Sequence, residues 1–308
     1  MNILFVSQIL PAEDWIPALS RLLPQDRFFT SEKFEPASID IALIAAPKRG
    51  VVGQLPNVRF VQSLFMGVDG LLADPTFPRD KPLARLIDPG MVAAMTESVV
   101  AHVLDYHRHH YAYRADQAQK RWHRLPQYMA SDRTIGILGL GELGTAVARR
   151  LLPFEFKVTG WKRSSAEIAA IEVFSGAAGI DELLARSQVV VSLLPLTDET
   201  RGVLNAAAFA RMPKGGAIIN VARGPQVVGG DLIAALDSGH LAHAYLDVFD
   251  TEPLPPDSPL WTHPGVTITP HSAALTEPRT AMARVVENIE RVRAGRSALN
   301  LVDFSAGY

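Results

Sequence analysis

Apolar residues recur along the chain in short runs that alternate with amphipathic stretches, which is the pattern of strands alternating with helices. In the first third of the chain, residues 3–6, 41–45 and 60–64 predict strands. Residues 16–23 predict a helix, with Pro17 tolerated in its first turn. Strands separated by helices join as parallel neighbours. We therefore predict that the chain begins with a parallel α/β sheet.

The pattern changes near residues 86–90, where Asp88-Pro89-Gly90 is typical of a loop. Thr96 then caps a predicted long helix over 96–122, which is rich in His, Tyr and Arg. A second series of strands and helices follows. Its predicted strands are 134–138, 158–161, 189–193, 217–221, 244–248 and 266–269, and its helices are 142–152, 181–186, 206–211 and 230–238, with a closing helix over 276–294.

Composition narrows the function classes. The chain has 308 residues, of which 48% are hydrophobic, and a net charge of -2, so nothing favours nucleic acid or an anionic membrane as a partner. No uncharged apolar run approaches the roughly 20 residues that span a bilayer. The opening MNILFVSQIL has no basic leader and predicts a strand rather than a signal peptide. The absence of cysteine excludes disulfides and thiolate metal sites and fits a reducing compartment. We expect a soluble, cytoplasmic protein.

The segment TIGILGLGELGTAVARRL places Gly139, Gly141 and Gly144 as G-x-G-x-x-G between a predicted strand and a predicted helix. The first glycine permits a tight turn, the second lets the backbone approach a pyrophosphate, and the third lets helix and strand pack closely. The helix N-terminus adds free N–H groups and a positive dipole end. A glycine-rich turn without a ligand is the alternative, but the flanking strand and helix favour dinucleotide binding.

The next predicted strand ends at Trp161, where NAD-binding proteins usually place an acid that holds the ribose 2′-OH. Here Lys162, Arg163, Ser164 and Ser165 follow instead. Arg binds a phosphate bidentately and Ser donates to it, whereas a carboxylate would repel it. A solvated basic loop is the alternative. We predict that NADP is preferred, with NAD still possible.

Three segments follow strands of the second series: NVARGPQVV with Arg223, LDVFDTEPLP with Asp247 and Glu252, and ITPHSAA with His271. Each has an ordinary explanation alone, as a strand cap, a loop carboxylate or a surface histidine. Their order downstream of a dinucleotide-binding turn favours a catalytic site.

Here the chain resembles the D-isomer-specific 2-hydroxyacid dehydrogenases over nearly its whole length. The resemblance includes SLLPLTDETRGVLN, PKGGAIINVARG and LDVFDTEPLPPDSPLW. WKRSS, the short length and the C-terminal Ala306-Gly307-Tyr308 are most similar to the glyoxylate/hydroxypyruvate reductase A group. The resemblance implies two Rossmann-like doubly wound parallel-sheet domains. A dinucleotide-binding domain over 96–274 would be inserted into a discontinuous substrate domain formed by 1–95 and 275–308. It also implies a homodimer and NADPH-dependent reduction of small 2-keto acids, glyoxylate and hydroxypyruvate, to 2-hydroxy acids.

The chemistry explains the three residue types. During reduction, negative charge builds on the carbonyl oxygen that receives a proton. His271 is the candidate acid, because histidine changes charge near neutral pH. Glu252 would orient its ring and favour the imidazolium. Arg223 would bind the substrate carboxylate and polarise the carbonyl.

The resemblance further implies two groups of ligand-binding residues. Beyond the glycine turn and its basic loop, the cofactor would contact Glu142, Leu143, Leu194, Pro195, Val221, Ala222, Arg223, Asp247, His271 and Ala273, with Asp247 at the nicotinamide carboxamide. A structural role for Asp247 remains open. The substrate would meet Phe65, Met66, Gly67, Val68, Arg223, His271 and Trp122. Phe65 and Met66 are bulkier than is usual in the family, which favours a small substrate or reflects ordinary packing.

The arm Arg121-Trp122-His123 resembles the dimer-forming element of the family. Trp122 would reach the partner's active site, unless it only packs against its own helix end. His107 and His110 share a predicted helix face, but no third ligand lies one turn away, so we expect no metal site.

Two alternatives remain. A D-lactate- or phosphoglycerate-type dehydrogenase is disfavoured because no acid follows Trp161 and no regulatory domain follows the closing helix. A dinucleotide-sensing, corepressor-like binding protein shares the fold, and turnover of glyoxylate with NADPH separates it from an enzyme.

Overall fold

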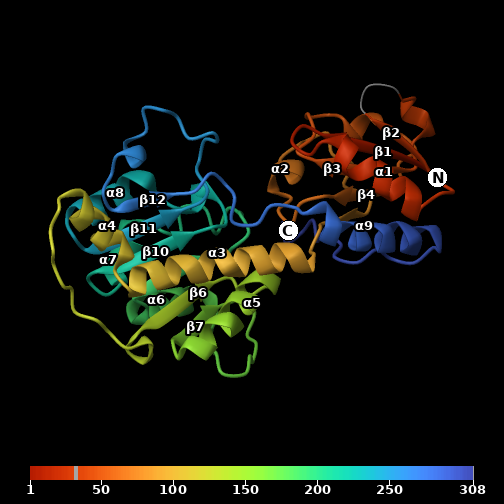
Figure 1. The fold of residues 1–308 in the computed structure, drawn as a ribbon. Coiled ribbons are helices and arrows are strands. Elements are labelled where there is room, and N and C mark those ends of the chain that lie inside the picture. Colours follow the sequence, from red (N-terminus) through yellow and green to blue (C-terminus); the bar gives the residue numbers. More distant parts are fainter. Residues whose placement is uncertain (31–33, 308) are drawn as a thin grey trace. The chain divides into compact units, whose positions relative to one another are not determined.

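The computed structural model describes residues 1–30 and 34–307, which fold as two compact units (Figure 1). The first comprises Met1–Met91 and Leu275–Tyr308, and the second comprises Val92–Ala274. The chain passes into the second unit within the helix α3 (Pro89–His107). None of the described helices is both long and apolar enough to cross a membrane.

The first unit contains a five-stranded parallel sheet in the order β2-β1-β3-β4-β5. Its strands are β1 (Asn2–Ser7), β2 (Arg27–Thr30), β3 (Ile41–Ala45), β4 (Phe60–Ser63) and β5 (Leu83–Ala84). α1 (Ala12–Leu22) and α9 (Pro278–Arg293) pack against each other, and a short helix, α2 (Asp69–Leu72), follows β4. α9 is bound to β4 through its buried Asn288, whose amide donates to Gln62 Oε1 at 2.7 Å.

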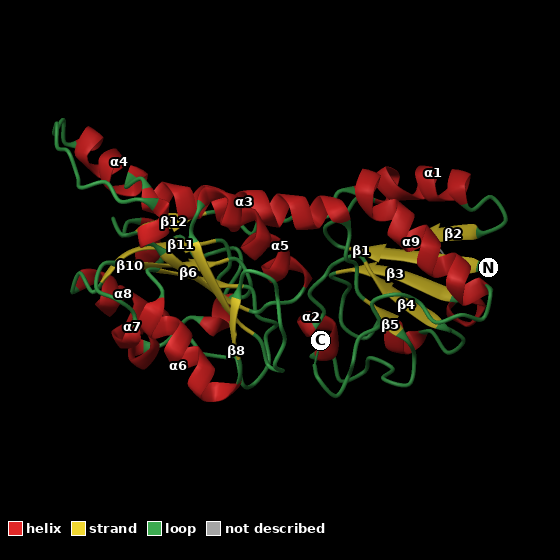
Figure 2. Cartoon of the chain, turned by 90° about the horizontal axis from the view of Figure 1, so that it is seen from below, coloured by secondary structure: helices red, strands yellow, loops and turns green. Residues whose placement is uncertain are grey.

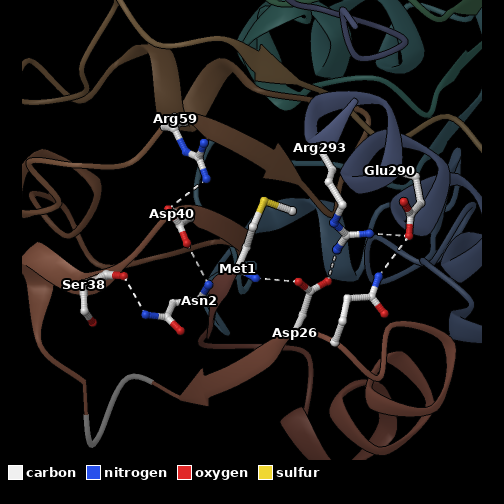
Figure 3. A network of polar contacts seen from close by, with 9 residues as sticks. Met1, Asn2, Asp26, Ser38, Asp40, Arg59, Glu290 and Arg293 are labelled. Atoms are coloured by element: carbon white, nitrogen blue, oxygen red, sulfur yellow. Dashed lines mark hydrogen bonds and ion pairs between the residues drawn. The ribbon is translucent and has the colours of Figure 1, made fainter. Parts of the chain in front are cut away.

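Polar contacts join the C-terminal helix to the start of the chain (Figure 3). The buried carboxylate of Asp26 accepts from the amino group of Met1 at 2.6 Å and also pairs with Arg293 of α9. Asp40 accepts from the backbone N–H of Asn2 at 2.8 Å and from Arg59 at 2.9 Å. Residues from both ends of the sequence therefore share one polar network in the first unit.

The second unit contains a seven-stranded parallel sheet in the order β12-β11-β10-β9-β6-β7-β8. Its strands are β6 (Thr134–Leu138), β7 (Lys157–Trp161), β8 (Glu172–Phe174), β9 (Val189–Ser192), β10 (Gly216–Asn220), β11 (Leu241–Leu246) and β12 (Val266–Ile268). One face packs against α3 and α5 (Glu142–Leu151), and the other against α6 (Gly176–Arg186), α7 (Ala206–Arg211) and α8 (Gly229–Asp237) (Figure 2). The predicted fold class is confirmed.

The prediction of one continuous helix over 96–122 is wrong in its bounds, because the structure has two helices there. α3 begins at Pro89, because Asp88 accepts hydrogen bonds from the N–H groups of Gly90 and Met91, and Thr96 instead bonds back to a carbonyl within the helix. The helix ends at His107, and α4 (His110–Ala118) starts after His109, whose φ of 58° is left-handed. Residues 121–129 form no helix.

Smaller differences concern the start of one helix and three short strands. α1 begins at Ala12 rather than residue 16, so Pro17 lies inside the helix. The short strands β2, β5 and β8 were not predicted. β2 is only half-buried, so its residues show no clear apolar run.

A partly buried cluster of polar side chains lies between β11, α3 and α4 in the second unit. Asp105 accepts from Tyr245 at 2.7 Å and from both terminal nitrogens of Arg114. His243 is 3% exposed and its ring packs 4.7 Å from that of Tyr245. Burial lowers the pKa of His243 to about 4, and His102 has a lowered pKa for the same reason. Both rings are therefore neutral at pH 7.

The second unit should lose stability in acid. The unfolded chain binds more protons than the folded one between the ordinary histidine pKa of 6.5 and the folded value of about 4. The free energy of unfolding therefore falls as pH drops through this window, by up to about 1.4 kcal/mol per pH unit for His243. In urea titrations from pH 7 to 4.5, His243→Gln should reduce this slope. A wild-type slope in His243→Gln would contradict the assignment.

Candidate active site

The candidate residues of the second unit lie along the carboxyl edge of its sheet. The strand order reverses at β6, which has β7 on one side and β9 on the other. In doubly wound sheets the crevice outside the carboxyl ends of the strands at such a switch point binds ligands. β6 and β7 are followed by the glycine turn and the basic loop, and β10 to β12 by the three candidate catalytic residues.

The three glycines of the turn are needed for different reasons. Gly139 has a φ of +102°, and a Cβ there would lie 2.8 Å from the carbonyl oxygen of Leu193. A Cβ on Gly144 would lie 1.9 Å from the carbonyl oxygen of Gly139. A Cβ on Gly141 would meet no atom within 4 Å, although this residue precedes α5, whose N-terminus has no side-chain cap. The fold itself therefore needs Gly139 and Gly144, whereas Gly141 leaves space beside the N–H groups of Glu142 and Leu143.

The end of β7 supports the turn from the other side. The carbonyl of Trp161 accepts from the N–H groups of Gly139 and Leu140 at 3.0 and 3.1 Å. The indole N–H of Trp161 donates to the carbonyl of Gly176 at 2.7 Å, so this ring is held against the start of α6. Arg163 and Ser164 follow as exposed side chains. The basic loop therefore begins at the glycine turn.

His271 and Glu252 form a direct pair. His271 Nδ1 lies 2.7 Å from Glu252 Oε2, and Glu252 Oε1 accepts from the backbone N–H of Phe249 at 2.8 Å. The carboxylate is thus fixed at both oxygens, and Nδ1 is the ring nitrogen that carries a proton towards it. The His271 side chain is 53% exposed, so part of the ring is open to solvent.

The segment that bears His271 is held by Asp247, which is buried at the end of β11. Its carboxylate accepts from the Thr269 hydroxyl at 2.6 Å and from the N–H groups of Ser272 and Ala273 at 2.9 and 3.1 Å. These bonds surround His271, whose φ of 50° is unfavourable for a residue with a side chain. The structural role left open for Asp247 is therefore present. A contact with a nicotinamide carboxamide stays a prediction.

Arg223 lies shortly after the end of β10, between Ala222 and Gly224. Its Nη1 donates to the carbonyl of Ala222 at 2.6 Å, and its own carbonyl accepts from the buried amide of Asn220 at 2.9 Å. A Cβ on Gly224 would lie 2.0 Å from the carbonyl carbon of Phe249. The Arg223 segment thus packs directly against the loop that leads to Glu252.

Two buried amides that hold segments of the candidate site were not predicted from the sequence. Gln226 is fully buried, accepts from the Ser192 hydroxyl at 2.7 Å and donates to the carbonyl of Leu194 at 2.9 Å. It therefore fixes the Leu194-Pro195 segment. Asn220 fixes the segment of Val221, Ala222 and Arg223 in the same way. The only signal in the sequence was that each of these amides lies beside a run of apolar residues.

The remaining predicted site residues lie elsewhere. Phe65, Met66, Gly67 and Val68 belong to the first unit, after β4, so their part in the site stays a prediction. Trp122 is 94% exposed between Arg121 and His123, which both pair with Asp116, so it does not pack against its own helix end.

Two of the histidines at the junction of α3 and α4, His107 and His109, make local contacts. The ring of His107 meets Phe156 edge-on at 5.1 Å, and His109 Nε2 lies 2.9 Å from the carbonyl oxygen of Pro126. In the described part of the chain, no group of three or more His, Asp or Glu could hold a metal ion.

The chain is similar to proteins of a known family. The NAD binding domain model of the D-isomer specific 2-hydroxyacid dehydrogenases matches residues 100–273. Glyoxylate/hydroxypyruvate reductase A of Serratia proteamaculans (strain 568) is 40% identical, with 100% of both chains covered. A D-isomer specific 2-hydroxyacid dehydrogenase from Xanthobacter autotrophicus Py2, crystallised with NADPH and MES, has a TM-score of 0.96 at 40% identity, covering 100% of this chain and 99% of that one.

A third similar protein is the NADPH-dependent glyoxylate/hydroxypyruvate reductase from Sinorhizobium meliloti, crystallised with NADP and sulfate. It has a TM-score of 0.93 at 36% identity, covering 100% of this chain and 99% of that one. Together these matches define an NAD(P)-dependent oxidoreductase. The chain belongs to the D-isomer specific 2-hydroxyacid dehydrogenase family, as the sequence resemblance predicted. Tyr308, which contributed to that resemblance, lies outside the described residues.

The glycine turn allows a matched test. Gly141→Ala adds a methyl group where no protein atom lies within 4 Å, so the free energy of unfolding should change by less than about 0.5 kcal/mol. The methyl group should nevertheless weaken NADPH binding by about tenfold or more, because it would lie against the pyrophosphate.

Gly144→Ala is the control for this prediction. It should lower the free energy of unfolding by about 1–3 kcal/mol through overpacking against Gly139. Urea unfolding and fluorescence titration with NADPH measure the two effects. Unchanged NADPH affinity in Gly141→Ala would refute the role of this turn.

Proposed function

We propose that this enzyme uses NADPH to reduce small 2-keto acids, glyoxylate and hydroxypyruvate, to glycolate and D-glycerate. The observation that carries the proposal is the 2.7 Å contact between His271 and Glu252, on the same sheet edge as the glycine turn. Full-length similarity to glyoxylate/hydroxypyruvate reductase A supports the substrate class over D-lactate or phosphoglycerate. The catalytic pair favours an enzyme over a dinucleotide-sensing binding protein.

The residues of the turn fit a dinucleotide. The space at Gly141 admits a pyrophosphate against the N-terminus of α5, where the helix dipole favours negative charge. Lys162, Arg163 and Ser164 follow β7 at the place where the adenosine ribose is bound. Two cations and a hydroxyl favour a 2′-phosphate, and similar proteins were crystallised with NADPH or NADP.

The bound cofactor supplies the hydride that reaches the carbonyl carbon. His271 donates the proton from Nε2 to the carbonyl oxygen as negative charge develops there. Glu252 holds Nδ1 and stabilises the imidazolium before the transfer. Arg223 binds the substrate carboxylate and polarises the carbonyl with its fixed charge. Asp247 keeps the ring in place through the loop that bears it.

Substitutions in the His271–Glu252 pair should affect the rate of the chemical step and not the binding of the cofactor. His271→Ala should lower kcat for glyoxylate by about 100-fold or more and leave the Kd for NADPH nearly unchanged. In Glu252→Gln, the imidazolium loses its carboxylate, so the reductive rate should begin to fall at a lower pH than in the wild type. Steady-state rates across pH check both variants. A pH–rate profile that is unchanged in Glu252→Gln would exclude this residue as the partner.

The cofactor preference has its own test. Arg163→Ala should remove a charge-assisted contact of about 1.5–3 kcal/mol from NADPH and have little effect on NADH. Kd values for both cofactors measure the difference. Equal losses with the two cofactors would contradict a 2′-phosphate site at this residue.

We further propose a cytoplasmic homodimer. The proposal is supported by the cysteine-free composition and by the exposed segment 121–129, which contains the arm Arg121-Trp122-His123. Trp122, Tyr128 and Met129 expose 94%, 45% and 65% of their surface in this segment. A second copy of the chain would bury these side chains. Trp122 would then narrow the partner's substrate cleft and exclude water from it.

Trp122→Ala should therefore leave a dimer with a raised KM and an altered preference among keto-acid side chains. Sedimentation at assay concentration, run beside the kinetics, tests the shared site. A fully active wild-type monomer would disprove it. Unchanged selectivity among keto acids in Trp122→Ala would also contradict a role for Trp122 in the partner's substrate cleft.

A further inference from the structure

The arginine that follows β7 is already in contact with a carboxylate from another loop. Arg163 Nη2 lies 3.5 Å from Glu199 Oε2, and the two side chains are 47% and 78% exposed. Glu199 belongs to the connection between β9 and α7. No acid directly follows Trp161 in the sequence, but the fold brings one to Arg163 from the loop that follows β9.

The topology places this ion pair across the carboxyl end of β6. β7 and β9 are the two neighbours of β6, so Arg163 and Glu199 approach from opposite sides of the glycine turn. In dinucleotide sites the pyrophosphate lies at this turn and the adenosine ribose at the end of the next strand. The pair therefore lies beside the position that a 2′-phosphate would take.

A rigid turn presents Glu199 in this position. The buried Thr200 donates its hydroxyl to the carbonyl of Pro195 at 2.7 Å and accepts from the N–H of Thr197 at 2.8 Å. Arg201 N–H also donates to the carbonyl of Thr197 at 3.0 Å. These bonds fix the backbone on both sides of Glu199 and leave its side chain pointing into solvent near Arg163.

We propose that Glu199 is a specificity-determining residue that competes with the cofactor 2′-phosphate for Arg163. This inference rests on the proposed NADPH-dependent function. An exposed ion pair in water opens easily, and a phosphate of higher charge replaces the carboxylate on Arg163. NADH has no 2′-phosphate, so it leaves the pair closed. Glu199 thereby reduces the preference for NADPH that Arg163 provides.

Direct binding to the full-length protein tests this competition. Fluorescence titrations give the Kd of NADPH and NADH for the wild type, Glu199→Gln, Arg163→Ala and the double variant. Glu199→Gln should tighten NADPH binding by about two- to fivefold, the range of an exposed ion pair, with NADH affinity unchanged. In the Arg163→Ala background the same substitution should have no effect.

Asp198→Asn is the matched control, because it removes an exposed carboxylate from the same turn. An equal gain in NADPH affinity in Asp198→Asn would overturn the proposal, since it would reflect only general charge. A wild-type Kd in Glu199→Gln, or a gain that persists without Arg163, would also overturn it while leaving the proposed function standing. Equal losses of both cofactors in Arg163→Ala would instead refute the 2′-phosphate site and the inference with it.

Discussion

The buried carboxylate of Asp247 is the interaction on which the candidate active site depends. It accepts three hydrogen bonds from the segment 269–273 and so offsets the left-handed backbone of His271. A buried carboxylate without donors would be strongly destabilising, so the loop and the charge stabilise each other. With the backbone held in this way, the His271 ring meets Glu252. Under the proposed mechanism, loss of Asp247 would disturb catalysis through the position of His271.

In the proposed site, one half of the second unit's sheet bears the cofactor-recognition residues and the other half bears the residues of the chemical step. β6, β7 and β9 lead into the glycine turn, the basic loop and the turn that presents Glu199. β10, β11 and β12 lead into Arg223, the Asp247–Glu252 loop and His271. Because all seven strands are parallel, both groups lie on one carboxyl edge. The reversal of strand order at β6 leaves the crevice that a dinucleotide needs to reach from one group to the other.

The sequence was most informative where a local pattern determines local structure. The strand Thr134–Leu138 and the helix Ala206–Arg211 were predicted with their observed bounds, because their apolar pattern is local; the structure adds that Asn205 caps the helix. The break between α3 and α4 was not predicted. It depends on distant partners, such as Pro126 for His109 and Gly215 for Tyr106, that no local pattern contains.

The same distinction applies to the candidate site. The glycine turn, Arg223, Glu252 and His271 were named from their motifs. The positioning roles of Asp247 and Gln226, and the approach of Glu199 to Arg163, arise from hydrogen bonds and ion pairs between loops that only the folded sheet brings together.

The most direct test of this account follows a labelled hydride. NADPH deuterated at both hydrogens of nicotinamide C4 is incubated with the wild-type enzyme and glyoxylate, and the product is examined by mass spectrometry and NMR. We predict glycolate with one deuteron at C2. Oxidation of NADPH without deuterium in glycolate, or no turnover of glyoxylate at all, would contradict it.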